Sequence, residues 1–179
     1  SNFNYKIFMT IFKKFTNALL LLSLVQFVQS CINPGKTAKP DKVVASMAQA
    51  LAKKYPHTPL IEVKELAKSI PYILVDVREA REIAVSMIPG AISVVEFEKT
   101  KEKHINKLII PYCTIGMRSS KYTDQLIQKG FKAKNLKGGV LSYAHHGYKF
   151  THDKKETNKV HVYSEAWNLL PEAYIGIFE

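Results

Sequence analysis

Cysteine is scarce in this chain, whose 179 residues include only Cys31 and Cys113. The apolar segment near residues 18–28 is well short of the ~20 residues that a membrane-spanning helix needs. The six histidines lack the spacing of metal ligands, with one another or with cysteine, so we expect no metal. Internal repeats and low-complexity tracts are also absent. These absences leave one domain with extensions, since 179 residues are enough for a single core.

Acidic residues are missing from the first 30 positions and outnumbered elsewhere. The formal net charge is +11, from 26 basic and 15 acidic side chains. Without the three lysines of that segment, the remainder has 23 basic side chains and a net charge of +8. Such a field favours anionic substrates or an anionic membrane surface, although a solvated basic surface explains it more simply. No recognition motif accompanies the charge, so we do not expect nucleic acid as a partner.

Residues 1–30 have the layout of a secretory signal peptide, with Lys13-Lys14 before the apolar core and Ser30 before Cys31. The run Val28-Gln29-Ser30-Cys31 also resembles the bacterial lipobox, which predicts lipidation of Cys31. We therefore expect an exported bacterial protein, either periplasmic or held at a membrane as a lipoprotein. Ordinary signal cleavage and an uncleaved signal anchor remain open. If Cys31 is lipidated, Cys113 is the only free thiol and an internal disulfide is impossible.

Residues 31–40 are rich in proline, glycine and lysine and are predicted to be a tether. A helix is predicted over 41–56, with Asp41 as its cap. A domain is expected over 57–150, and a C-terminal extension that packs on it over 151–179. Within the domain, strands alternate with helices, which favours an α/β fold with a mainly parallel central sheet flanked by helices. The predicted strands lie near residues 60–61, 72–77, 91–94, 107–112 and 133–136, and the predicted helices near 63–68, 79–86, 96–107, after 119 and after 139.

The most informative segment is Cys113-Thr114-Ile115-Gly116-Met117-Arg118-Ser119. It lies between the buried strand 107–112 and a predicted helix. A cysteine at that point faces backbone N–H groups at a helix start, and such groups favour an anionic sulfur. A lone cysteine is more often a small core residue. Its position before Gly116 and Arg118 instead favours a reactive thiol.

Four motifs in this order resemble the successive motifs of the single-domain rhodanese-like (sulfurtransferase) family, over residues from about 60 to 147. They are Asp76-Val77-Arg78-Glu79, Ile88-Pro89-Gly90-Ala91, the cysteine loop with Tyr112, and Asn135-Leu136-Lys137-Gly138-Gly139-Val140. The resemblance implies a rhodanese-like three-layer fold and transfer of a sulfane sulfur through a persulfide on Cys113, with no other cofactor. It also implies a small anionic donor such as thiosulfate and a thiol or protein as acceptor.

The resemblance assigns the loop residues to substrate and persulfide binding. Arg118 supplies a permanent cation for an anionic donor, although it could instead cap the loop or pair with an acid. Ile115 and Met117 either shape the entrance or pack on the core. Asp76 and Arg78 are expected to support neighbouring loops. The loop members are Thr114, Ile115, Gly116, Met117, Arg118 and Ser119. Tyr163 and Trp167 are predicted to form an apolar clasp for the C-terminal tail rather than a ligand cage.

Two other functions remain open. Phosphatases and arsenate reductases use a related cysteine–arginine loop, but that loop is one residue longer than the four-residue interval between Cys113 and Arg118. The shorter loop favours a sulfur atom over a tetrahedral oxyanion. A non-catalytic persulfide carrier or protein-binding module is the second alternative. The sequence leaves the oligomeric state open.

Overall fold

The computed structural model describes residues 38–68 and 71–178. Within it, Lys39–Glu179 form one compact unit. The predicted signal segment 1–30, Cys31 and most of the predicted tether lie outside the described residues. In the part of the chain that is described, no helix has the length and apolar character needed to cross a lipid bilayer.

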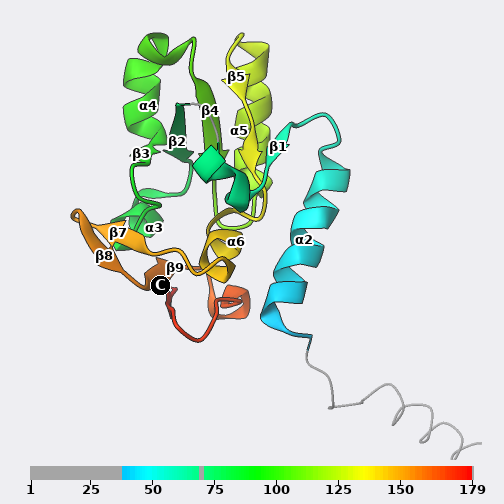
Figure 1. The fold of residues 1–179 in the computed structure, drawn as a ribbon, viewed down its shortest axis with the longest axis vertical. Helices are drawn as coiled ribbons and strands as arrows, with labels where there is room; N and C mark the ends of the chain where they lie inside the picture. Colours follow the sequence, from blue (N-terminus) through cyan, green and yellow to red (C-terminus); the bar gives the residue numbers. More distant parts are fainter. Residues whose placement is uncertain (1–37, 69–70, 179) are drawn as a thin grey trace, which may run out of the picture. The chain divides into compact units, whose positions relative to one another are not determined.

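A four-stranded parallel sheet forms the centre of the unit (Figure 1). Its order is β3 (Ile92–Ser93), β2 (Tyr72–Asp76), β4 (Leu108–Tyr112) and β5 (Lys132–Ala133). In addition, β1 (Leu60–Ile61) pairs in parallel with β6 (Asn135–Leu136). Asp76 and Tyr112 are partners in the register of β2 and β4, so these strands end side by side. The predicted α/β fold with a mainly parallel sheet is confirmed.

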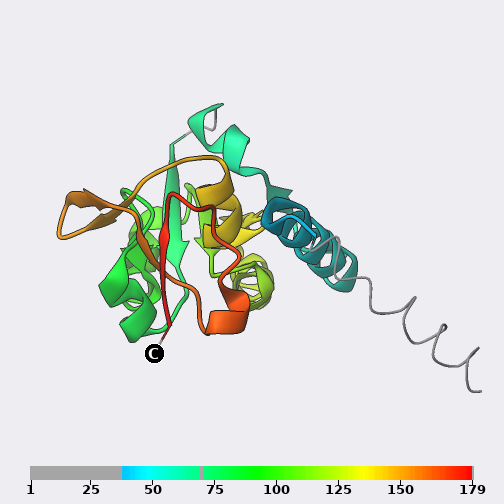
Figure 2. The same ribbon diagram turned by 90° about the horizontal axis from the view of Figure 1, so that it is seen from below.

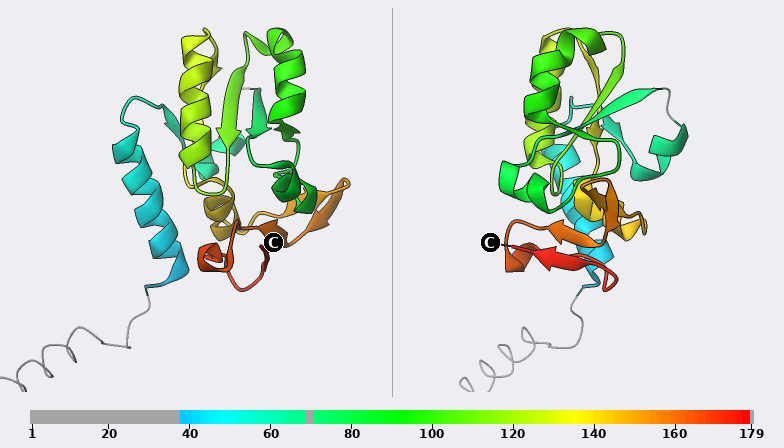
Figure 3. Two further views of the ribbon diagram at one scale, coloured as in Figure 1. Left: turned by 180° about the vertical axis from the view of Figure 1, so that it is seen from behind. Right: turned by 90° about the vertical axis from the view of Figure 1, so that its left-hand side faces the viewer.

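Alternate residues of each strand point to opposite sides of this sheet. Both sides carry apolar side chains, so helices cover both faces. Val75 and Ile109 belong to one apolar cluster, which includes Phe97 of α4 (Val94–Thr100) and Leu126 of α5 (Met117–Gln128). Leu74 and Ile110, the neighbours of Val75 and Ile109, belong to a second cluster with Leu141 of α6 (Gly139–His145). The predicted three-layer arrangement is therefore confirmed (Figure 3).

The first described helix, α2 (Pro40–Lys54), starts earlier than predicted and lacks the predicted cap. Lys39 is its N-cap residue and provides no side-chain hydrogen bond, whereas Asp41 lies inside the first turn. Proline suits the start of a helix, and a carboxylate in the first turn interacts favourably with the helix dipole. Val44 and Ala48 are buried. Further helical segments before the C-terminal segment are η1 (Val63–Lys68), α3 (Ala80–Val85) and η2 (Lys101–His104).

Other boundaries also differ from the predictions. The helix expected over 96–107 starts earlier, as α4, and is followed by the separate segment η2. The helix expected after Ser119 is α5, which starts at Met117 because Gly116 at φ 116° ends the loop there. The single strand expected over 133–136 is two strands, β5 and β6, in different sheets. The residue between them, Lys134, donates its N–H to Ile109 O at 3.0 Å. The segment predicted as one strand thus pairs with two different strands, β4 and β1.

The C-terminal segment packs on the α6 side of the sheet. It contains the antiparallel hairpin β7 (Phe150–His152) and β8 (Lys155–Thr157), then β9 (Lys159–His161), η3 (Glu165–Trp167) and β10 (Ile175–Ile177). β9 and β10 pair in parallel, and the chain between them loops out and returns (Figure 2). Val160 and Val162 are fully buried and join the cluster of Leu141. The segment is therefore part of the main core.

Candidate active site

Cys113 follows the last residue of β4 and is 2% exposed. Its Sγ accepts a hydrogen bond from Gly116 N–H at 3.2 Å and one from the Ser119 hydroxyl at 3.5 Å. Gly116 is also the N-cap residue of α5, so the sulfur lies at the start of that helix. Both donors favour a negatively charged sulfur at this position.

A second helix start fixes the loop from the other side. Val140 N–H donates to Cys113 O at 3.0 Å, and Leu141 N–H donates to Thr114 O at 3.2 Å. This approach requires glycine at position 139, because a Cβ there would lie 2.0 Å from Cys113 O and φ is +50°. The Gly138-Gly139 turn thus allows α6 to hold the backbone of the cysteine loop.

The far end of the loop is held by side chains. Asn135 Nδ2 donates to Gly116 O at 3.3 Å and to Ser120 Oγ at 2.9 Å. Ser120 Oγ in turn donates to Gly116 O at 2.8 Å. Asn135 and Ser120 are almost completely buried, and Gly116 is buried as well. The loop around the sulfur is therefore preorganised.

Arg118 forms a bidentate ion pair with Glu82 of α3. Its Nη1 and Nη2 donate to the two carboxylate oxygens at 2.6 and 2.8 Å. The Thr114 hydroxyl donates to Glu82 Oε1 at 3.2 Å. The Glu82 side chain is fully buried, whereas that of Arg118 is 32% exposed. The one cation of the loop therefore has its partner inside the protein.

The electrostatics of this pair favour the charged forms. Burial by itself would raise the pKa of Glu82, but hydrogen bonds from Arg118 and from the backbone N–H of Glu79 lower this pKa to about 2. The hydrogen bonds with Glu82 raise the pKa of Arg118 above its ordinary value. Sequence reasoning missed Glu82. The available signal was its three-residue spacing from Glu79, since the two form a capping box at the start of α3.

Asp76 and Arg78 form a separate buried pair. Arg78 Nη2 donates to Asp76 Oδ2 and to Ser86 O, both at 2.6 Å. The Arg78 guanidinium also lies 5.9 Å from the ring centre of Tyr112, the residue before Cys113. Burial and the Asp76 carboxylate raise the pKa of Tyr112 well above its ordinary value. The structure thus places this pair at the adjoining strand ends and brings the loop residues together around Cys113.

A pocket of about 400 Å³ opens above Cys113. Met117 is exposed at the pocket, whereas Ile115 is buried and also belongs to the core. The lining residues are Glu79, Cys113, Thr114, Ile115, Met117, Arg118, Tyr163 and Trp167. The prediction for Tyr163 and Trp167 was an apolar clasp. Trp167 does pack against the core, but both residues also line this pocket.

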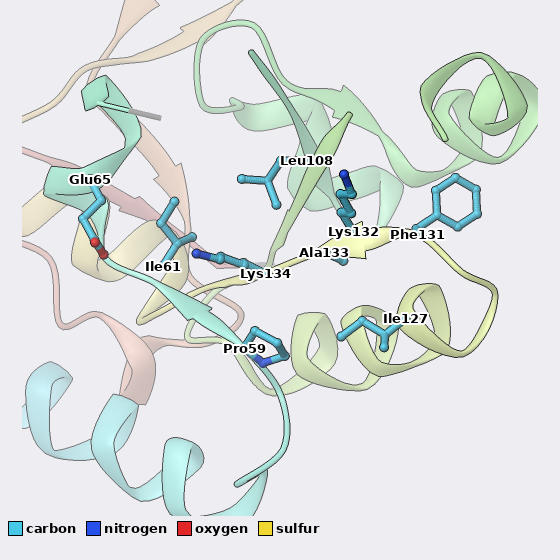
Figure 4. A pocket seen from close by; sticks show the side chains of 9 residues that line it. All are labelled: Pro59, Ile61, Glu65, Leu108, Ile127, Phe131, Lys132, Ala133 and Lys134. Atoms are coloured by element: carbon cyan, nitrogen blue, oxygen red, sulfur yellow. The ribbon is translucent and has the colours of Figure 1, made fainter. Parts of the chain in front are cut away.

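A larger cavity of about 540 Å³ lies away from the cysteine loop. Figure 4 shows its lining side chains, which come from β1, η1, β4, the end of α5, β5 and the residues beside them, and include Lys132 and Lys134. None of them belongs to residues 113–119. Cys113 therefore lies in the smaller pocket. The described residues contain no group of three or more histidine, cysteine or acidic side chains that could hold a metal ion.

Comparison with known proteins gives the family of this domain. The family model of the rhodanese-like domain matches residues 60–146. A sulfurtransferase from Allochromatium vinosum is 33% identical over 88 residues, which cover 47% of this chain and 82% of that protein. The chain therefore belongs to the rhodanese-like family.

Other matches share only part of their length with this chain. A tRNA uridine(34) hydroxylase from Ruegeria pomeroyi is 33% identical over 89 residues, which cover 44% of this chain and 30% of that protein. The chain thus corresponds to less than a third of this relative. Among solved structures, protein BH2092 from Bacillus halodurans has 24% sequence identity and a TM-score of 0.48, over 62% of this chain and 87% of that one.

Proposed function

We propose that this protein is a sulfurtransferase that moves a sulfane sulfur from an anionic donor such as thiosulfate to a thiol-type or protein acceptor through a persulfide on Cys113. The observation that carries the proposal is the placement of the Cys113 sulfur. Cys113 lines a pocket, and its sulfur accepts hydrogen bonds from Gly116 N–H and the Ser119 hydroxyl. Membership of the rhodanese-like family and the relative named as a sulfurtransferase support it.

In the first step, the Cys113 thiolate attacks the outer sulfur of thiosulfate. The sulfur–sulfur bond of the donor breaks, and sulfite leaves with its electron pair. The product is an anionic persulfide on Cys113, which Gly116 N–H and Ser119 stabilise as hydrogen-bond donors. No other cofactor enters this scheme, because the persulfide itself carries the sulfur.

In the second step, an acceptor attacks the outer sulfur of the persulfide. The bond between that sulfur and Cys113 breaks, and Cys113 leaves as a thiolate ready for another cycle. Cys113 is the one cysteine among the described residues. Under this proposal Cys31 is lipidated and has no free thiol, so the acceptor is a separate molecule.

The test combines intact-mass measurement with turnover. The protein is incubated with thiosulfate, its mass is recorded, and cyanide is then added while thiocyanate is assayed. A mass gain of one sulfur atom with thiocyanate formation supports the enzyme, and Cys113→Ser should abolish both. Sulfur uptake without turnover indicates the carrier alternative. Hydrolysis of phosphate esters without sulfur uptake would overturn the proposal in favour of a phosphatase.

The proposed site of action is outside the cytosol. The signal-like pattern of residues 1–30 and the lipobox-like run ending at Cys31 support an exported protein held at a membrane by lipid. Labelling of the wild type with a radioactive fatty acid, and loss of the label and of membrane association in Cys31→Ser, would support lipidation. Equal membrane association without label would instead indicate an uncleaved anchor.

A further inference from the structure

The pocket above Cys113 has one wall that the rhodanese-like match does not cover. The match ends at residue 146, whereas Tyr163 and Trp167 lie in the C-terminal segment. Both nevertheless line the pocket together with Cys113. Their rings meet edge to face, with ring centres 6.4 Å apart and planes at 77°. A segment outside the matched domain thus contributes an aromatic pair to the reactive sulfur's surroundings.

The backbone at Tyr163, from which this ring projects, is strained. Its φ is +74°, which a bulky residue rarely adopts. Ser164 N–H donates to Val162 O at 2.9 Å, so the three residues form a γ-turn of the rare, strained kind. Such strain persists only where the surroundings impose it, and it is common at functional sites.

The surroundings of Tyr163 impose this strained backbone conformation. Tyr163 N–H donates to His161 Nδ1 at 3.1 Å, and His161 is 2% exposed. Val162 is fully buried, and its N–H donates to Ile177 O at 2.9 Å. The first residue of the turn is therefore anchored in the core and to β10, while Tyr163 remains 53% exposed at the pocket. An aromatic ring held at an exposed position is preorganised to contact another molecule.

The charged groups of the pocket are already paired with opposite charges. Arg118 is bound to Glu82 in a bidentate pair, and Glu79 accepts a hydrogen bond from Arg81 at 3.0 Å. The other lining residues that are at least partly exposed are Met117, Tyr163 and Trp167. The walls therefore offer apolar and aromatic surface rather than an uncompensated charge.

We propose that Tyr163 and Trp167 determine acceptor specificity, favouring a small organic thiol with an apolar or aromatic body over a hydrophilic one. This inference rests on the sulfurtransferase function proposed above. The acceptor's body packs against the two rings and Met117 while its sulfur reaches the persulfide. A bond forms between the acceptor sulfur and the outer sulfur, and the bond from the outer sulfur to Cys113 breaks. The acceptor thiol and the Cys113 persulfide anion thus give an acceptor persulfide and the Cys113 thiolate, with no other reactant.

The first experiment measures selectivity in a single turnover. Cys113 is loaded with inorganic polysulfide, excess reagent is removed, and sulfur loss is timed with benzyl mercaptan and with 2-mercaptoethanol at equal thiolate concentration. The quantity compared is the ratio of the two rates, so that intrinsic differences between the thiols cancel between variants. Tyr163→Gly and Trp167→Ala should each reduce the preference for benzyl mercaptan by about 3- to 10-fold. Tyr163→Phe should retain the wild-type ratio, because it keeps the ring.

Tyr163→Gly also separates selectivity from misfolding. Glycine adopts a positive φ readily, so this variant should unfold at the same temperature as the wild type or at a higher one. Tyr148→Ala is the matched control, since Tyr148 is a comparably exposed aromatic residue that does not line the pocket. It should leave the rate ratio unchanged.

The second experiment measures binding without chemistry. Trp167 is the only tryptophan of the chain, so its fluorescence reports on this pocket alone. In Cys113→Ser, titration with benzyl mercaptan should change the emission with saturation, and the same concentrations of 2-mercaptoethanol should not. If Cys113 takes up sulfur but the ratio of the two thiol rates is equal in the wild type, Tyr163→Gly and Trp167→Ala, this inference alone is overturned. Failure of Cys113 to take up sulfur from polysulfide would overturn the sulfurtransferase function with it.

Discussion

The guanidinium of Arg118 holds both carboxylate oxygens of Glu82, at 2.6 and 2.8 Å, within reach of the Thr114 hydroxyl of the cysteine loop. This ion pair joins α3 to the start of α5. It fixes the position of the loop's cation and also neutralises much of its charge. Stability and donor binding are therefore both coupled to Glu82.

Glu82 should make the fold sensitive to acid. Its pKa is about 2 in the folded protein, below the ordinary 4.5. A lowered folded-state pKa adds stability that is fully present above pH 4.5 and is lost as the pH falls through about 2. Its contribution above that window is about 3 kcal/mol. In urea unfolding at a series of pH values, Glu82→Gln should be less stable at pH 7 and lose less stability between pH 4.5 and 2. Glu102→Gln, at an exposed position, is the control and should follow the wild type.

Removal of Arg118 should affect stability and donor use separately. Arg118→Ala leaves a buried carboxylate without a cation and should lower the free energy of unfolding by about 2–4 kcal/mol. Adding Glu82→Gln should restore part of this loss, which a double-mutant cycle measures. The kcat/KM for thiosulfate should fall at least about tenfold in Arg118→Ala and remain low in the double variant. Recovery of kcat/KM in the double variant would show that Arg118 serves only to pair with Glu82.

Gly139→Ala should displace the cysteine loop. The added Cβ would lie 2.0 Å from Cys113 O at a φ of +50°, so clash and backbone strain should together cost about 3 kcal/mol or more. Gly147→Ala is the matched control, because φ there is +78° but a Cβ would have open space. It should cost only about 1 kcal/mol. Thermal unfolding and the rate of sulfur uptake should both be impaired much more in Gly139→Ala; equal effects would contradict the close approach of α6.

Two adjacent serines should differ in effect. The Ser119 hydroxyl donates to Cys113 Sγ, whereas that of Ser120 donates to Gly116 O. Ser119→Ala should slow persulfide formation by about tenfold, which corresponds to the loss of one hydrogen bond to a charged group. Ser120→Ala should mainly lower the unfolding free energy, by about 1–2 kcal/mol. Rapid-mixing measurement of sulfur uptake, with urea unfolding alongside, would separate the two, and a larger rate effect at Ser120 would contradict the assignment.

The strands beside the site could be predicted because local signals were strong. β2 and β4 are short, nearly continuous apolar runs, as expected of strands buried on both faces. Even Pro111 in β4 is compatible with its position. Tyr112 O bonds Val77 N–H on the β2 side, and Ile109 O bonds Lys134 N–H on the other. The Pro111 nitrogen therefore faces away from β2, beyond the last paired residue of β5, and the missing N–H removes no ladder bond.

The partners of these local features could not be predicted in the same way. Glu82 follows Glu79 and Arg81 in a charged stretch that looks solvent-exposed, and only the fold brings α5 across to bury it. The place of Tyr163 depends on long-range pairing of β9 with β10 and on a positive φ at a residue that seldom adopts one. Such facts arise from packing between distant segments, and no sequence periodicity encodes them.

The parallel pairing of β9 with β10 brings a second, separate stretch of sequence to the pocket that Cys113 lines. β9 and β10 hold both ends of the segment between them in the core. This segment, residues 162–174, is called the arch here, and Tyr163 and Trp167 lie on it. The sulfur-holding loop and this arch are separate stretches of sequence. Substitutions on the arch can therefore alter which molecules approach the sulfur while the groups that hold it stay unchanged, and evolution can vary the two independently.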